Sequence, residues 1–195
     1  LEFRRVLFRS SSTALQTIYA IKDPLTNTPL GDVHASSSVV AQTLSQATAN
    51  APRTITSNAV DWSTANGWRV DLIGTGERVN VDMQVIFQSL TVATNTPNND
   101  ACTAGGSSYL YNFDLNTGSA PQGSTTGVVG TWLGGTLVVG MSYLTLQQTG
   151  STDPGTGRTI TVIIDNRGVP RTDDVPPPPP PPATGRRTSW RELVN

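Results

Sequence analysis

The sequence has few of the residues that most often carry out chemistry. Its 195 residues include one histidine (His34), one cysteine (Cys102) and one lysine (Lys22), and only 14% of them are charged. A single histidine leaves no histidine pair to hold a metal ion. No cationic residue adjoins Cys102 in the sequence to activate its thiol. We therefore expect no catalytic residues, and we predict that the protein is not an enzyme.

Charge and hydropathy exclude two further classes. The formal net charge is −1 and the arginines form no basic face, so we expect no nucleic-acid partner. No stretch approaches the roughly 18–20 apolar residues that cross a membrane as a helix, so we expect no transmembrane segment. Abundant Ser, Thr, Asn and Gly between β-branched runs are typical of an exported all-β protein. In such a protein Cys102 has either a disulfide partner outside this chain or a buried free thiol.

Residues 1–10 differ in character from the rest of the chain. They match, codon for codon, the translation of a common short-read sequencing adapter, and they have neither the apolar run nor the cleavage site of a signal peptide. We expect them to be a scar of sequence assembly, with the natural reading frame starting mid-gene. Without them the net charge becomes −3, because they hold three arginines and one glutamate.

Strand patterns dominate the remainder of the chain. Residues 36–49 have some helix propensity, but Val39, Val40, Thr43 and Thr48 favour a hairpin. Helical periodicity is weak throughout. Strands are expected near 17–22, 39–45, 53–58, 67–72, 79–94, 107–114, 133–147 and 158–165. Burial is expected for Tyr19, Ile21, Leu90, Val92, Leu110, Phe113, Val138, Leu144, Val162 and Ile164.

A faint repeat recurs along the chain. Segments 18–23 and 110–114 share an apolar-Tyr-x-apolar stretch that ends at an aspartate before a Thr-containing turn, and 160–168 is a weaker third copy. Aspartate bonds to the backbone two residues on, and glycine supplies positive φ, so each strand is predicted to turn there. The first two copies are 92 residues apart, about twice the ~40–50-residue period of a four-stranded propeller blade.

An ordered set of short motifs is more specific than any one of them. The set comprises Tyr19–Asp23, Ala41–Leu44, Thr56–Asn58, Val60–Trp62, Gly67–Leu72, Gly76–Asp82, Leu90–Thr94, Pro97–Cys102, Gly105–Gly106, Tyr109–Gly118 and Gly185–Leu193. In this order it resembles the β-propeller of the PilC/PilY family of type IV pilus biogenesis proteins. The resemblance covers roughly residues 17–193.

The resemblance implies both an architecture and a role. Residues 11–170 would be the C-terminal part of a propeller, its last two or three blades built of antiparallel strands. The protein would promote type IV pilus assembly, oppose pilus retraction and support adhesion without catalysis. Its partners would be minor pilins, other pilus components and the rest of the same propeller. It would lie in the periplasm, on the outer surface or on the pilus of a Gram-negative bacterium.

Members of this family carry a calcium loop resembling D-x-D-x-D, and this sequence has none. Asp23, Asn27 and Asp32 are too far apart in the sequence to form such a loop. The segment 98–100 offers only one carboxylate, and the two aspartates at 173–174 are followed by rigid prolines. The family's site therefore carries over to no residue, and we expect no metal or other cofactor. The pair Glu77 and Asp82 encloses Arg78 in the sequence, and we predict a strand-edge salt bridge there.

The end of the chain is expected to be a tail. Residues 171–185 form a proline-rich linker whose run Pro176–Pro182 is polyproline II, about 22 Å long. We interpret this run as a spacer, with an aromatic-groove ligand as the alternative. Residues 186–195 form a C-terminal tail that carries Trp190 and Leu193.

Two other functional classes remain open. One is a secreted β-rich adhesin or a phage fibre. The other is a quinoprotein-type propeller dehydrogenase, which the absence of Ala-x-Asp-x-x-Thr-Gly-x-x-x-Trp blade repeats opposes. The only histidine, His34, lies in a polar segment and is interpreted as a surface loop residue.

Overall fold

The computed structural model is built from strands. It describes residues 13–25, 27, 29–98, 105–122, 124, 126–146 and 158–175. Within these ranges every regular element is a strand, so the all-β fold class is confirmed, and none of them is a helix that would cross a membrane. The adapter-like residues 1–10, Cys102, the run Pro176–Pro182 and the tail 186–195 lie outside the described residues.

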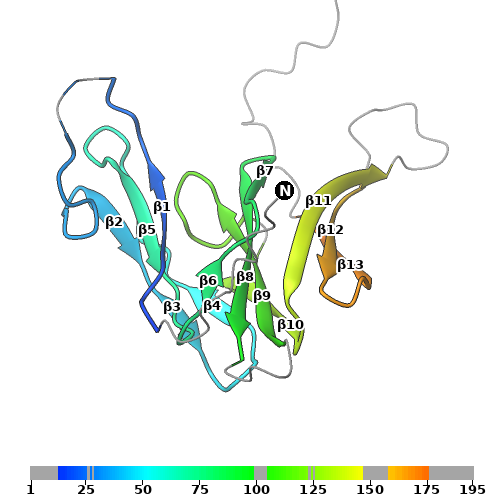
Figure 1. Cartoon of the computed structure of the whole chain (residues 1–195). Coiled ribbons are helices and arrows are strands. Elements are labelled where there is room, and N and C mark those ends of the chain that lie inside the picture. The colour runs from blue at the N-terminus through cyan, green and yellow to red at the C-terminus, as the bar shows by residue number, and fades with distance from the viewer. Residues whose placement is uncertain are drawn as a thin grey trace, which may run out of the picture.

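Three sheets lie next to one another (Figure 1). The first has the order β1 (Thr17–Ile21), β5 (Gly67–Asp71) and β2 (Val39–Gln42). Strand β1 is antiparallel to β5, whereas β2 is parallel to it. This parallel pair departs from the antiparallel pairing that was predicted. It is possible because the 24 residues between the two strands make a crossover through the second sheet.

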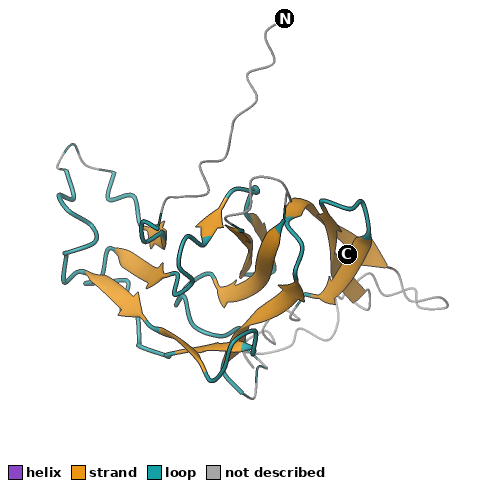
Figure 2. Ribbon diagram, turned by 60° about the horizontal axis from the view of Figure 1, so that its bottom comes forward, coloured by secondary structure: helices purple, strands orange, loops and turns teal. Residues whose placement is uncertain are grey.

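The second sheet is the largest and curls around the core (Figure 2). Its strands are β3 (Leu44–Gln46), β4 (Arg53–Ile55), β10 (Val128–Gly134), β9 (Gly106–Asp114), β8 (Ser89–Pro97) and β6 (Arg78–Val79), with β7 (Gln84–Ile86) also on β8. The first seven residues of β8 are all buried, so both faces of this strand are covered. Alternate residues of β8 contribute to two different hydrophobic clusters.

The third sheet consists of β11 (Val138–Leu146), β12 (Arg158–Asp165) and β13 (Pro170–Asp174), all antiparallel. The strand predicted near 133–147 is present as β11 from Val138 onward, but residues 133 and 134 belong to the separate strand β10, which Gly134 ends at φ 103°. Strand β13 was not predicted. It extends the sheet into residues assigned to the linker, because its polar residues suit an edge strand. Sheets of three, seven and three strands are consistent with a partial, propeller-like fold, although none is a four-stranded blade.

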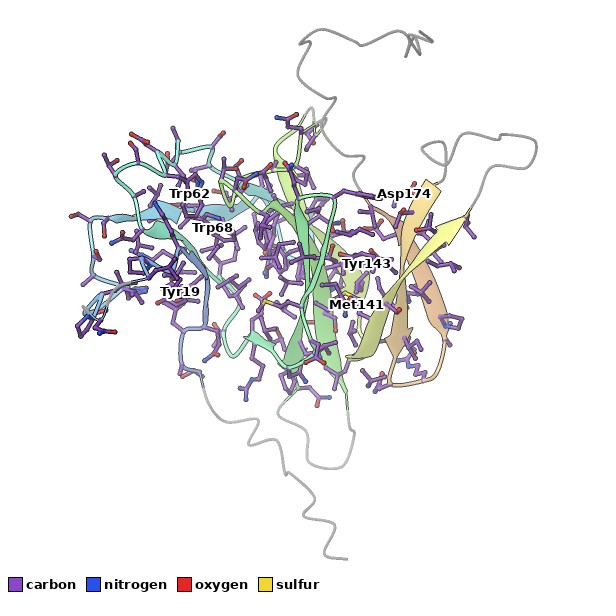
Figure 3. All side chains as sticks on the ribbon, turned by 90° about the horizontal axis from the view of Figure 1, so that it is seen from above. Tyr19, Trp62, Trp68, Met141, Tyr143 and Asp174 are labelled. Carbon is purple, nitrogen blue, oxygen red and sulfur yellow. The ribbon has the colours of Figure 1, made fainter. Side chains whose placement is uncertain are left out.

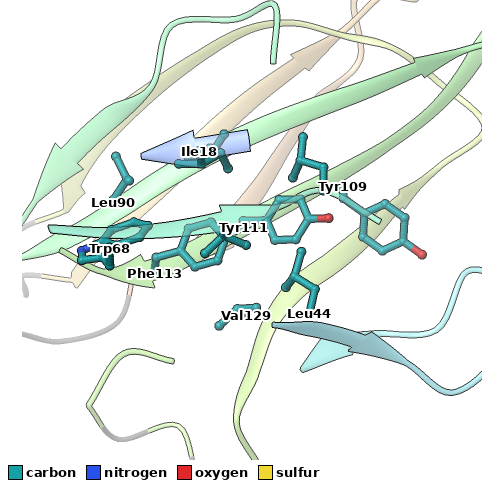
Figure 4. Close-up of a cluster of buried hydrophobic side chains, with 11 residues drawn as sticks. Ile18, Leu44, Trp68, Leu90, Tyr109, Tyr111, Phe113 and Val129 are labelled. Atoms are coloured by element: carbon teal, nitrogen blue, oxygen red, sulfur yellow. The ribbon is translucent and has the colours of Figure 1, made fainter. Parts of the chain in front are cut away.

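The larger hydrophobic core lies between the first two sheets (Figure 4). Tyr111 and Phe113 stack with their ring centroids 5.4 Å apart, and Trp68 lies 6.1 Å from Phe113. Aromatic pairs of this kind stabilise a core beyond the area they bury. The buried members are Ile18, Leu44, Trp68, Val70, Leu72, Leu90, Val92, Tyr109, Tyr111, Phe113 and Val129.

The burial predictions are correct for the central strands and wrong at the periphery. Tyr19 and Val162 are only half-buried, and Ile21, Leu144 and Ile164 are exposed. The two outer sheets are each covered on one face, so the side chains on their other face remain in solvent. Burial is confirmed for Leu90, Val92, Leu110, Phe113 and Val138.

The predicted aspartate turns are present in all three copies of the repeat. Asp114 accepts hydrogen bonds from the backbone N–H groups of Asn116 and Thr117, both at 2.9 Å. Asp165 and Asp23 bind the N–H two residues on at 2.9 and 2.8 Å. Glycine follows with positive φ in two copies (Gly118 and Gly168), whereas Leu25 takes this conformation in the first, at φ 54°. The aspartate is therefore the shared element of the turn.

The hairpin between β7 and β8 offers a test of backbone strain. Ile86 pairs with Ser89, and the two loop residues, Phe87 and Gln88, have φ of 49° and 69°. Such two-residue turns favour Asn-Gly, because most side chains clash in this conformation. We expect the double variant Phe87→Asn/Gln88→Gly to raise the free energy of unfolding by about 1–2 kcal/mol in urea denaturation. Phe87→Ala is the control and should change it little; a double variant less stable than the parent would contradict the prediction.

Candidate functional site

The most concentrated group of buried polar side chains surrounds Glu77, which is 1% exposed. Its carboxylate accepts hydrogen bonds from Arg53 Nη1 at 2.8 and 2.6 Å, one to each oxygen. Thr94 Oγ1 and Tyr111 Oη donate to Oε1 at 2.6 and 2.9 Å, and the backbone N–H of Gly74 donates to Oε2 at 2.9 Å. We call these five residues the Glu77 network. Both oxygens are occupied, so no position is open to a substrate.

Four separate segments build the Glu77 network. Arg53 begins β4, Thr94 and Tyr111 face one side of β8 and β9, and Glu77 lies in the turn before β6. Gly74 is required for the close approach, since a Cβ atom there would lie 2.4 Å from Glu77 Oε2. The network thus joins the turn 74–77 to the interior of the second sheet.

The position of Glu77 corrects the sequence-based interpretation. Its ion-pair partner is Arg53, 24 residues away, and not the adjacent Arg78. Asp82, the other predicted member of the pair, is exposed on the chain between β6 and β7. A buried carboxylate needs several donors, and here strand pairing, which local sequence does not reveal, brings them together.

A second layer of contacts holds the Arg53 guanidinium. Its carbon lies 3.7 Å from the centre of the Tyr109 ring, a cation–π contact. Gln46 Oε1 accepts from Arg53 Nε at 3.1 Å, and Gln46 Nε2 donates to Tyr109 Oη at 2.8 Å. The Tyr109 ring is tilted by 32° relative to the Tyr111 ring, with the two ring centroids 6.0 Å apart. The guanidinium is therefore fixed from both its edge and its face.

The electrostatics of the network act on Tyr111 and Arg53. Burial and the neighbouring Glu77 carboxylate raise the pKa of Tyr111 far above its usual value. Burial alone would lower the pKa of Arg53, but Tyr111 and Glu77 outweigh it and raise that pKa. Tyr111 remains a neutral donor and Arg53 a cation. A group that exchanges no proton near pH 7 is poorly suited to acid–base catalysis, and the arrangement has the character of a structural ion pair.

The only histidine belongs to a surface cluster on the first sheet. His34 Nδ1 lies 2.9 Å from Tyr19 Oη and 3.8 Å from Asp71 Oδ1. Asp71 also accepts from Thr17 Oγ1 at 2.7 Å and from Arg69 Nη1 at 3.0 Å. The His34 side chain is 44% exposed, which confirms that it is a surface loop residue. Within the described chain its ring hydrogen-bonds to the Tyr19 phenol, which is not a nucleophile for a triad.

No metal centre is evident in the part of the chain that the structure describes. There, no three His, Cys, Asp or Glu side chains come close enough together to hold an ion. Asp23, Asp32 and Asp114 accept hydrogen bonds from the backbone of their own turns. Asp100 lies outside the described residues, like Cys102.

The outer face of the third sheet carries several exposed apolar side chains. Leu144, Leu146 and Ile164 have 48, 44 and 45% of their surface in solvent, and Val139 has 59%. Adjacent apolar side chains on one exposed face are more typical of an interaction surface than of a free edge. Sequence patterns missed this face because the run Ile160–Ile164 is apolar at too many positions to show which ones point outward.

Comparisons with protein-family models, with curated proteins and with solved structures gave no match for this chain.

Proposed function

We propose that this protein is a non-catalytic β-sheet scaffold of the PilC/PilY type. It promotes assembly of the type IV pilus, opposes pilus retraction and supports adhesion at the surface of a Gram-negative cell. It acts by presenting sheet surfaces to minor pilins and other pilus components rather than by transforming a substrate.

The observation that carries the proposal is where the family-like motifs lie in the fold. Tyr19–Asp23 and Tyr109–Gly118 each combine a strand with an aspartate turn. Gly67–Leu72 contains the buried Trp68, and Leu90–Thr94 is buried on both faces of β8. Residues that form strands, turns and the core in this way are the ones that proteins with the same fold would have in common. The resemblance is therefore supported by positions that determine the architecture.

The ionisable residues also favour a scaffold over an enzyme. Glu77, the most buried carboxylate among the described residues, is saturated with hydrogen bonds, and Asp114 and Asp165 are occupied by turn backbone. His34 is exposed. An exposed apolar face on the third sheet is the kind of feature that a protein-binding scaffold needs.

Direct binding to minor pilins tests this function. The full chain, immobilised and titrated with purified minor pilins from a type IV pilus system, should bind saturably with a dissociation constant of about 1–10 μM. The heat-unfolded chain and an unrelated β-sandwich are the controls. Binding no tighter than to the controls would argue against the pilus role. Quinone-dependent dye reduction by the chain would instead favour the dehydrogenase alternative.

A further inference from the structure

The two faces of the third sheet differ in what they contact. On the inner face, Met141 and Tyr143 of β11 lie between the second and third sheets (Figure 3). Ile163, which pairs with Met141, is 1% exposed and belongs to the hydrophobic cluster that also contains Ala93 and Leu110 of the second sheet. The outer face is the opposite side of the same three strands, so its side chains point away from this cluster.

Strand register gives the composition of the outer face. Leu144 pairs with Ile160 and Gly140 with Ile164, and directly opposed residues share a face. Val162 lies between the two isoleucines at the same period of two, and Leu146 follows Leu144 in the same way. The apolar side chains of the outer face are therefore those of Leu144, Leu146, Ile160, Val162 and Ile164.

Three of these side chains are open to solvent. Leu144, Leu146 and Ile164 are 48, 44 and 45% exposed. Ile160 and Val162 are more covered, because they lie on the central strand β12 between β11 and β13. Single exposed apolar residues are ordinary, but neighbours on one face indicate a surface that another segment or protein covers.

The size of the outer face limits what can cover it. Its longest strands have nine and eight residues, so the face is about 30 Å long, and its three strands make it about 14 Å wide. The resulting footprint of about 400 Å² is half of the roughly 800 Å² that each partner buries in a stable complex. A second copy packed on this face would bind weakly. A segment of the same chain needs less area, because its tether gives it an effective concentration in the millimolar range.

The chain leaves the third sheet close to these apolar residues. Asp174 near the end of β13 pairs with Ile160, which pairs with Leu144, so two strand spacings of about 10 Å in total separate Asp174 from Leu144. The next residue, Val175, still donates its backbone N–H to the carbonyl of Thr159 at 3.1 Å. The segment that follows Val175 therefore starts beside the exposed end of β11.

The length of this segment allows it to return to the outer face. The seven consecutive prolines Pro176–Pro182 span about 22 Å as polyproline II. The next eight residues, 183–190, can extend over about 26 Å, which is enough to lead back along the whole proline run. Trp190, and Leu193 three residues later, are thus within reach of the outer face.

We propose that the C-terminal tail, residues 186–195, docks on the outer face of the third sheet. The Trp190 indole and the Leu193 side chain cover Leu144 and Leu146, and the contact removes apolar surface of both segments from water. A partner protein that used the outer face would have to displace the tail. This docking needs no pilus component, so it stands or fails separately from the proposed function.

Limited proteolysis of the full chain tests the docking. Trypsin cleaves after arginine, and the tail contains Arg186, Arg187 and Arg191. Leu144→Ser leaves the tail unchanged and should make cleavage within it about 5–20-fold faster, because the rate follows the fraction of undocked tail. Leu144→Met keeps the apolar contact and should retain the parent rate. Val85→Ser is the matched control and should also retain it, since Val85 is 56% exposed but lies on β7 of the second sheet.

The environment of Trp190 gives a readout that does not depend on cleavage. The fluorescence difference between the parent and Trp190→Phe isolates its emission, which should be blue-shifted and shielded from acrylamide in the parent at every protein concentration. If Leu144→Ser does not fold, this signal of the parent still decides the matter. A solvated Trp190, with equal cleavage of the parent and Leu144→Ser, would overturn the proposal and leave the outer face to another protein. Shielding that appears only as the chain dimerises in sedimentation velocity would overturn it in favour of a second copy.

Discussion

Glu77→Ala is expected to lower the free energy of unfolding by about 3–5 kcal/mol. The change removes the acceptor for Arg53, Thr94, Tyr111 and the Gly74 N–H, and leaves the Arg53 guanidinium buried beside two aromatic rings without a counter-charge. Globular domains are stable by only about 5–15 kcal/mol, so this is a large fraction of the total. Urea denaturation followed by tryptophan fluorescence measures it.

A double-mutant cycle measures the interaction free energy of the Arg53–Glu77 ion pair. It separates this energy from the cost of leaving one of the two charges buried without a partner. Arg53→Met/Glu77→Leu removes both charges and keeps much of the volume, so it should be less destabilised than the sum of Arg53→Met and Glu77→Leu. Asp82→Ala is the control, since this carboxylate is exposed. If Glu77→Ala and Asp82→Ala had equal effects, the Glu77 network would contribute nothing to stability.

Patterns local in the sequence predicted local structure well. The segments of β1 and β5 were placed within a residue of their observed bounds, whereas the range predicted at 79–94 divides into β6, β7 and most of β8. The turn after Asp114 was also predicted, because an aspartate that binds N–H groups two and three residues on needs nothing from elsewhere in the chain.

Features that depend on sheet pairing were not predictable in the same way. The Arg53–Glu77 contact joins residues 24 apart on different elements, and neither has a neighbour that signals burial. Along β12, the apolar run conceals which residues face inward: Ile163, Thr161 and Thr159 are buried, whereas the expected Ile164 is exposed. Two of those inward positions are threonines because they face a polar part of the interface, which a hydrophobic pattern cannot reveal.

The other large effect is expected from Trp68→Ala, at about 3–5 kcal/mol of lost stability. Trp68 on β5 is fully buried, packs on Phe113 and donates from Nε1 to the carbonyl of Leu115 at 2.9 Å. Gly118 lies against the same ring, where a Cβ atom would come within 2.4 Å of it. The indole therefore ties the first sheet to both β9 and the turn after it, and its removal leaves a cavity and an unpaired carbonyl.

Two variants make this expectation specific. Trp68→Phe keeps an aromatic ring but loses the N–H donor, so it should lie between the parent and Trp68→Ala. Trp132→Ala is the matched control. Trp132 on β10 is 38% exposed, so its replacement should lower the free energy of unfolding far less than Trp68→Ala does. Urea denaturation monitored by far-ultraviolet circular dichroism compares all four proteins without depending on the tryptophan signal. If Trp68→Ala and Trp132→Ala lowered the free energy of unfolding equally, the first sheet would not depend on the Trp68 indole. The packing of the first two sheets against each other would then have to depend on Tyr111 and Phe113 alone.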